Sequence, residues 1–239
     1  PGAYYMGVWI WDSFFQAWAA IQTCQTTACL DLYMDAYRIL MSRQFADGQL
    51  PRQVEHYAVS GTNTWQAPGG WSFAVDQADT KFGTTQWSTE FYASLVRFHN
   101  YVRTRDSDGD GVYEWGGTNS GWDSSPRWTQ STMEAVDLQA WMILDAESLR
   151  NMARRLGNPA DEALWEARRQ AYITGYQSLC TPGPYCYDRT IANAPTTMLT
   201  PATYFGLLAG ALTPAQANAM LPALSDPLLL GPGTGDVGV

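Results

Sequence analysis

Apolar residues recur at the spacing of helix faces along most of this chain, and this periodicity constrains the fold more than any other feature of the sequence. The segments Leu30–Met41 and Thr84–Val102 each carry such a stripe, which predicts amphipathic helices. A third helix is expected to begin at Ser131, where Glu134 follows as in a capping box, and to end near Gly157. Further helices are expected at 159 onward, 204–208 and 214 onward. No segment alternates clearly enough to predict a β-strand.

Long loops rich in Gly, Trp and Asp separate these helices, mainly at 46–70, 105–130 and 180–200. Loops of this length in a compact domain are usually functional. Helix pairs joined by alternately short and long loops are typical of an α/α toroid, whose long loops line one mouth. The sequence therefore predicts an all-α (α/α)6 toroid with about seven or eight helices, incomplete at its C-terminus. Residues 1–239 would form the N-terminal and central part of a single barrel, with no separate second domain.

The charge and the aromatic content of the chain limit the classes of molecule that it can be expected to bind. The formal net charge is −9 and Lys81 is the only lysine, which argues against binding to nucleic acids or to anionic membranes. The chain has 11 Trp and 13 Tyr, a load that favours a carbohydrate partner because amphipathic rings stack on sugar faces. The alternative for any one of these rings is that it fills the core.

The four cysteines lie in two local pairs whose spacing does not match a zinc site. Three disulfide connectivities are open, and proximity in the chain favours Cys24–Cys29 and Cys180–Cys186. Two disulfides indicate a secreted or periplasmic protein. The sequence shows neither a signal peptide nor an apolar run long enough to span a membrane.

The segment Gly121–Trp128 carries the most specific chemical signal. Its sequence, GWDSSPRW, places Asp123 on a loop punctuated by Gly and Pro. Glycoside cleavage needs a carboxylic acid that protonates the leaving oxygen. Trp122 and Trp128 could form an apolar wall that raises the pKa of this acid, and Arg127 could orient a neighbour or a sugar hydroxyl. The alternative is a turn or N-cap aspartate without catalytic role.

A second constellation places Asp106, Asp108 and Asp110 at alternate positions before Gly111. Oxygen ligands in this pattern are typical of the first half of a calcium loop. The glutamate expected at the twelfth position is replaced by Gly117. A structural calcium site and a plain solvated turn both remain open, and no cofactor is required for the chemistry.

Residues 120–128 resemble the general-acid motif of glycoside hydrolase family 63 and of the related trehalases. Other segments resemble the signatures of this family in the same order along the chain. They are Trp9–Phe15, Gln44–Pro51, Gln66–Pro68, Arg105–Gly111 and Tyr185–Arg189. The resemblance therefore covers most of the chain.

This resemblance implies an (α/α)6 barrel that hydrolyses an α-glucosidic or related α-glycosidic bond with inversion. It assigns the general acid to Asp123, and a carbohydrate would be the substrate. Some members of the family hold calcium near the acidic loop. The residues expected around the sugar are Trp11, Asp12, Gln66, Trp122 and Arg127, with Trp128 in the apolar wall.

Two departures from the family pattern affect the expected activity. The frequent glutamate before Ser-Gly is Asn119 here, and no position matches the general-base glutamate. That base is expected beyond residue 239, so the chain alone would be inactive. The alternatives are a trehalase, which the Ser-Pro-Arg sequence disfavours, a mannosylglycerate-type hydrolase, and a non-catalytic carbohydrate-binding fragment.

Overall fold

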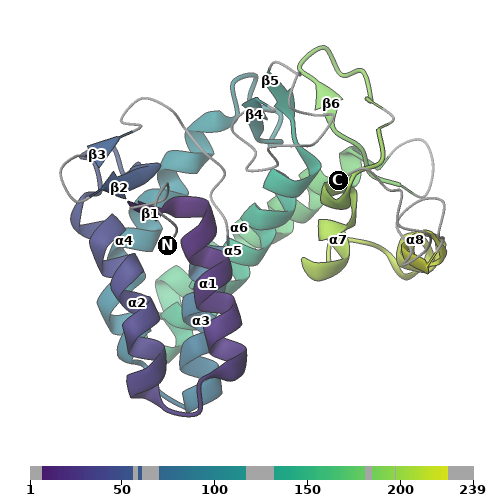
Figure 1. The fold of residues 1–239 in the computed structure, drawn as a ribbon. Coiled ribbons are helices and arrows are strands. Elements are labelled where there is room, and N and C mark those ends of the chain that lie inside the picture. The colour runs from purple at the N-terminus through teal and green to yellow at the C-terminus, as the bar shows by residue number, and fades with distance from the viewer. Residues whose placement is uncertain are drawn as a thin grey trace. The chain divides into compact units, whose positions relative to one another are not determined.

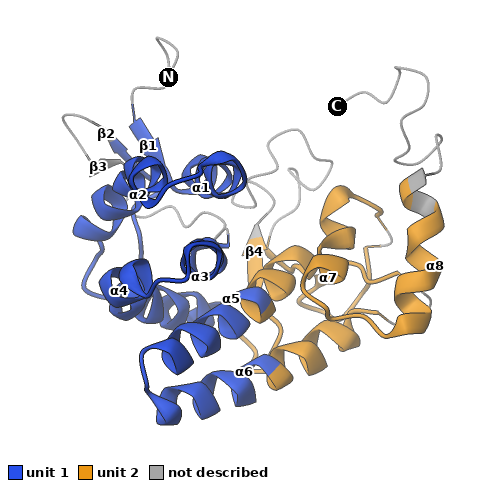
Figure 2. Cartoon of the chain, turned by 90° about the horizontal axis from the view of Figure 1, so that it is seen from below, with its two compact units in different colours: residues 1–105, 144–169 blue, residues 106–143, 170–239 orange. Residues whose placement is uncertain are grey.

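The computed structural model describes residues 7–55, 59–60, 70–116, 132–180, 185–196 and 198–225. These residues belong to two compact units, which are described separately (Figure 2). Unit 1 comprises Pro1–Arg105 and Leu144–Arg169, and unit 2 comprises Asp106–Ile143 and Gln170–Val239. That both units belong to one catalytic barrel stays a prediction.

Unit 1 is built from two helical hairpins, a small sheet and parts of two long helices, 144–155 and 159–169 (Figure 1). Helix α1 pairs with α2, α3 pairs with α4, and α1 also packs on α3. The side chains of Phe14, Leu30, Tyr37, Trp71 and Trp87 are fully buried. The elements are β1 (Gly7–Trp9), α1 (Ile10–Thr23), α2 (Thr27–Ser42), β2 (Gln53–Glu55), β3 (Val59–Ser60), α3 (Trp71–Phe82), α4 (Gln86–Val102) and the 3-10 helix η1 (Arg103–Arg105).

The turn between α1 and α2 is held by a disulfide and by side-chain caps. Cys24 and Cys29 are bonded, which confirms one predicted local pair. The Thr26 hydroxyl accepts a hydrogen bond from the Cys29 N–H at 3.2 Å and caps α2. At the end of α1 the Lys81 ammonium donates to the carbonyls of Ile21 and Cys24. This cation satisfies acceptors that the last turn of the helix leaves unpaired.

Helix α3 was not expected from the apolar pattern, because its buried face carries polar residues. Ser72, Asp76 and Asp79 are all buried on it. The two Asp79 oxygens accept from the backbone N–H groups of Trp87 and Ser88, at 3.2 and 2.7 Å, and so cap α4. Buried carboxylates with partners on other helices replace the apolar residues on which a periodicity argument depends.

Unit 2 combines helices with a three-stranded antiparallel sheet in the order β4-β5-β6. With the sheet of unit 1, six short strands occur among the described residues, so the expectation of no strands was wrong. The strands have two or three residues each, too short for an alternating pattern to be visible. Its own elements are β4 (Glu114–Gly116), β5 (Thr132–Glu134), β6 (Arg189–Thr190), the 3-10 helix η4 (Pro201–Tyr204), α7 (Phe205–Leu208) and α8 (Pro214–Ser225). Two long helices, α5 (Val136–Arg155) and α6 (Pro159–Ser178), contribute residues to both units, and unit 2 contains 136–143 and 170–178.

Helix α5 begins later than its capping-box signature predicted. Glu134 belongs to β5, and the helix starts at Val136. The Val136 N–H donates to Asp188 Oδ1 at 3.0 Å, so the cap comes from a residue 52 positions later. A long-range contact therefore replaces the local box. The capping box at the start of α8 does form, because Thr213 and Gln216 exchange side-chain and backbone hydrogen bonds.

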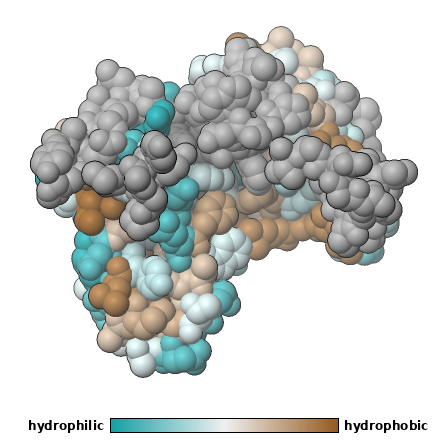
Figure 3. Space-filling view, in the orientation of Figure 1, coloured by the Kyte–Doolittle hydropathy of each residue, from teal (hydrophilic) through white to brown (hydrophobic). Residues whose placement is uncertain are grey.

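The second disulfide, Cys180–Cys186, confirms the other predicted local pair and lies just after α6. Within the described part of the chain, no helix is long and apolar enough to cross a membrane. On the face of unit 1 that carries α1 and α2, apolar spots are separated by polar residues (Figure 3). Scattered apolar residues of this kind, such as Leu32 and Ile39 on α2, are ordinary on protein surfaces.

Candidate active site

The predicted general acid, Asp123, lies outside the described residues, as do Gln66, Trp122, Arg127 and Trp128. The chain on either side of the acid segment is described. Gly116, at the end of β4, pairs with Thr132, at the start of β5, so residues 117–131 leave and return at adjacent positions of one sheet. The sheet therefore fixes both ends of the segment that contains Asp123.

Ionic contacts join this sheet to the acidic loop within unit 2. The Arg189 guanidinium on β6 donates through Nε to the Glu134 carboxylate on β5 and through Nη2 to Asp110 Oδ2, the latter at 2.6 Å. Glu134 is fully buried, and this burial raises the pKa of its carboxyl, whereas the Arg189 hydrogen bond lowers it. Its Oε1 has no hydrogen-bond partner among the described residues.

The three aspartates of the acidic loop converge as the sequence predicted. One carboxylate oxygen from each of Asp106, Asp108 and Asp110 lies within 4.8 Å of the others. Asp106 also accepts from the N–H groups of Gly109 and Gly111, at 2.8 and 3.2 Å. These oxygens match the ligands that Ca2+ prefers, and the backbone hydrogen bonds leave lone pairs on them. The ion pair of Asp110 with Arg189 already supplies one positive charge to this loop.

Glu114 and Glu134, the carboxylates on the strands at the two ends of the acid segment, both have structural partners. Glu114 Oε1 accepts from the hydroxyl and the backbone N–H of Ser107, at 2.6 and 3.0 Å, and closes the acidic loop. Glu134 is bonded to Arg189. We therefore assign neither of them the role of catalytic base.

Trp11 and Asp12 lie in the first turn of α1, in unit 1. The Trp9 ring, at the N-cap of this helix, lies under the Arg52 guanidinium at 5.6 Å, and the Ile10 N–H donates to the Arg52 carbonyl. The Trp11 ring is partly exposed, and Asp12 is exposed near the positive end of the helix dipole. Both residues are thus anchored by β1 and its pairing with β2.

Sequence reasoning did not single out Asp188 and Arg189 as individual site residues. Asp188 caps α5, and Arg189 on β6 joins this strand and β5 to the acidic loop. They lie within a segment that resembled the family, but their partners are 52 to 79 positions away. The sequence YCYDR does not alternate between apolar and polar residues, so no local pattern indicated which of its side chains face inward.

The sequence family described as mannosylglycerate hydrolase MGH1-like glycoside hydrolase domain matches residues 4–232 of the chain. A comparison with curated proteins finds no significant match. Among solved structures, an uncharacterised conserved protein of Thermus thermophilus has 17% identity and a TM-score of 0.79. The match covers 93% of this chain and 70% of that one.

The family 63 mannosylglycerate hydrolase of Thermus thermophilus is similar in two further structures. In complex with glucose it has 17% identity and a TM-score of 0.78, covering 95% of this chain and 71% of that one. In complex with Tris and D-glycerate it has 16% identity and a TM-score of 0.75, covering 91% of this chain and 69% of that one. These similarities confirm the predicted all-α fold of the (α/α) toroid type.

Proposed function

Because this chain belongs to the family of MGH1-like glycoside hydrolase domains, we propose that the full-length protein hydrolyses an α-glucosidic or related α-glycosidic bond with inversion, with Asp123 as general acid. The observation that carries this proposal is the family match over residues 4–232, which includes the Gly121–Trp128 segment. The sheet at the two ends of this segment supports it, since a catalytic acid must be held in a fixed position.

The chemistry that we assign to Asp123 is proton transfer to the leaving oxygen. An apolar wall from Trp122 and Trp128 would raise the pKa of this carboxyl and keep it protonated until the bond breaks. Inversion also requires a second carboxylate about 6.5–9.5 Å away, which activates water on the opposite face of the sugar. Trp11, Asp12, Gln66 and Arg127 are proposed to contact the sugar at the cleavage point.

Two substrate classes follow from this assignment. We propose an α-glucoside or α-linked oligosaccharide as the first. The second is a mannosylglycerate-type substrate, which the family description and the relative solved with D-glycerate favour. A panel of α-linked glucosides and mannosylglycerate, with the product anomer followed by NMR, separates them. Inversion predicts that the first product carries the opposite anomeric configuration to the substrate.

Replacement of the acid tests the mechanism directly. Asp123→Asn keeps the size of the side chain but cannot donate the catalytic proton, so hydrolysis of an unactivated α-glycoside should fall by about 10²–10⁴-fold. The matched control is Asp35→Asn, an exposed carboxylate on α2, which should keep full activity. Near-normal turnover by Asp123→Asn would contradict the assignment. Sugar binding without turnover in the unaltered protein would favour a non-catalytic carbohydrate-binding role instead.

Calcium at the acidic loop is a further proposal, with a structural role. The convergence of Asp106, Asp108 and Asp110 supports it, and the plain turn is the alternative. If calcium binds, removing it with a chelator should lower the melting temperature by about 5 °C, the effect of a ligand near saturation. An unchanged melting curve, with no metal found by elemental analysis, would favour the plain turn.

Export from the cytoplasm is proposed from the two disulfides, Cys24–Cys29 and Cys180–Cys186. Both close short loops at the ends of helices. Thiol titration of the protein purified from its natural source tests this proposal. The expected result is no free thiol before reduction and four after it, from the four cysteines of the sequence.

A further inference from the structure

The segment 185–189 in unit 2 alternates between buried and partly exposed residues. Cys186 and Asp188 are 0% and 2% exposed, whereas Tyr185, Tyr187 and Arg189 are partly exposed. Successive side chains of an extended chain point to opposite sides. One side of this segment therefore faces the interior, and the other presents a Tyr-Tyr-Arg row.

The inward side is held by covalent and polar contacts. Cys186 is bonded to Cys180, just after α6, and the Asp188 carboxylate accepts from the Val136 N–H at the start of α5. The backbone N–H of Tyr187 also donates to a carbonyl just after α6, at 3.1 Å. These contacts fix the backbone of the segment, so the outward rings stand on a preorganised support.

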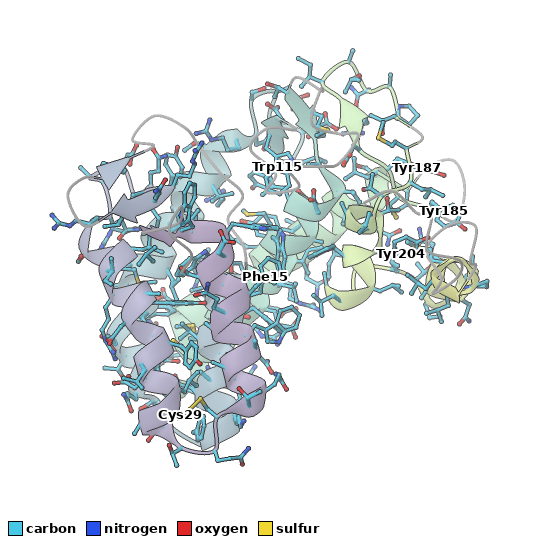
Figure 4. All side chains as sticks on the ribbon, viewed as in Figure 1. Phe15, Cys29, Trp115, Tyr185, Tyr187 and Tyr204 are labelled. Carbon is cyan, nitrogen blue, oxygen red and sulfur yellow. A yellow bond between two sulfur atoms is a disulfide. The ribbon has the colours of Figure 1, made fainter. Side chains whose placement is uncertain are left out.

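The outward side forms an aromatic cluster, which we call the tyrosine shelf and define as Tyr185 and Tyr187 above Tyr204 (Figure 4). The rings of Tyr185 and Tyr187 are 6.2 Å apart and inclined at 57°. Tyr185 packs, with Leu207 and Leu212, on a core cluster of Tyr204 and Met220. Tyr204 is 8% exposed, and its hydroxyl has no hydrogen-bond partner among the described residues. The shelf thus has a buried floor and two partly exposed rings.

Burial raises the pKa of both Tyr187 and Tyr204, and the neighbouring tyrosines raise it further. These phenols therefore stay protonated over the working range of an enzyme, and the partly exposed Tyr187 can donate a hydrogen bond to a ligand. A ring face beside hydroxyl donors is the combination that recognises a pyranose, which has apolar C–H faces and an equatorial rim of hydroxyls.

We propose that the tyrosine shelf is a sugar-binding subsite that holds a pyranose ring of an oligosaccharide substrate away from the cleaved bond. This inference rests on the proposed glycoside hydrolysis. The shelf leads directly into β6, which pairs with β5, the strand that follows the acid segment. An oligosaccharide with one ring at the sheet could therefore extend along the strand to the shelf.

Kinetics on a homologous series test the subsite. The intact protein and its Tyr187→Leu variant are assayed on maltose through maltohexaose. Leucine keeps apolar bulk but removes the flat ring, so kcat/KM for the longest substrate should fall about tenfold, mainly through KM. The value for maltose should change less than about twofold, because a disaccharide does not need a distant subsite. Tyr187→Phe retains the ring and should stay within about threefold of the unaltered protein.

The matched control is Tyr33→Leu, an exposed tyrosine on α2 in unit 1, which should leave all substrates unaffected. Equal losses on short and long substrates, or no loss on either, would overturn the subsite. Calorimetric titration of maltohexaose into the Asp123→Asn protein, with and without Tyr187→Leu, separates the two proposals. Weaker binding in the double variant supports the shelf even if Asp123→Asn still hydrolyses, and equal binding overturns it.

Discussion

Two arginines, one in each unit, bind several carboxylates in different surroundings. In unit 1, Arg38 donates to Asp31, Asp35 and Glu90 at 2.6–2.8 Å, and the carboxylate side chains are 36–59% exposed. The arginine hydrogen bond lowers the pKa of Asp31. This cluster joins the surfaces of α2 and α4.

In unit 2, Arg189 has a side chain that is only 14% exposed, and one of its partners, Glu134, is completely buried. Unlike Arg38, Arg189 does not lie on the surface of helices that an apolar core already holds together. It joins short strands to a loop. We therefore expect an arginine to contribute little to the free energy of unfolding where apolar packing already fixes the structure, and much where it compensates a buried charge.

The largest expected effect is that of removing the buried pair's cation. Arg189→Met leaves the Glu134 carboxylate buried without compensation, so the free energy of unfolding should fall by about 3–5 kcal/mol. The pKa of Glu134 is already raised by burial, and protonation would relieve the unpaired charge, so the deficit should shrink on acidification. Denaturant unfolding at pH 7 and pH 5 measures both effects. Recovery of stability in Arg189→Met/Glu134→Leu is the control, and a loss below 1 kcal/mol would break the comparison.

A second prediction concerns the buried histidine of unit 1. His99 is fully buried against Asp145, with its ring edge-on to Trp165, and burial lowers its pKa. Below about pH 6.5 the unfolded chain takes up a proton that the folded chain does not, so stability falls as pH drops towards the lowered folded pKa. The slope is at most about 1.4 kcal/mol per pH unit.

Thermal unfolding between pH 7 and pH 5 measures this slope. In His99→Gln the contribution disappears, so the dependence on pH should flatten. An unchanged slope would show that folding does not shift the pKa of His99, and a steeper slope would show that His99 is charged in the folded protein. A charged His99 would form a second compensated buried pair in unit 1, beside Asp76–Arg155.

The smallest effect is expected for the exposed cluster. Arg38→Met should lower the free energy of unfolding by no more than about 1 kcal/mol, because each ion pair is exposed to solvent. Raising the salt concentration to about 1 M should remove most of the difference, since the Debye length is then about 3 Å. A loss as large as that of Arg189→Met would show that exposure does not separate the two arginines.

The apolar pattern predicted those helices whose buried face is apolar. Helices α2 and α4 have such faces, with Leu30, Met34 and Tyr37 on the first and Trp87 and Phe91 on the second. The pattern failed at α3, where the buried Asp76 bonds to Asn151 and Arg155, residues 75 and 79 positions away. Such partners cannot be read from a local window.

The candidate site divides in the same way, into features that local motifs predicted and features that depend on long-range contacts. Motif resemblance supplied the family and the segment Trp9–Phe15, and the structure places Trp11 and Asp12 of this segment on the first turn of α1. The role of Asp123 stays a prediction. The resemblance did not show that Glu134 lies in a strand, because its conformation depends on pairing with Arg189, 55 positions later. Long-range pairs between charged residues have no signature in a single sequence.

Lys81 of α3, whose ammonium lies at the end of α1, has a consequence for the chemical modification of this protein. The sequence offers one side-chain amine, that of Lys81, and its ammonium is engaged by carbonyls beside the Cys24–Cys29 disulfide. Acylating dyes and amine-reactive resins therefore have a single side-chain target, and acylation of Lys81 removes the positive charge at the C-terminal end of α1. The rate of labelling at Lys81 is consequently a site-specific reporter of how often this side chain leaves the carbonyls at the end of α1.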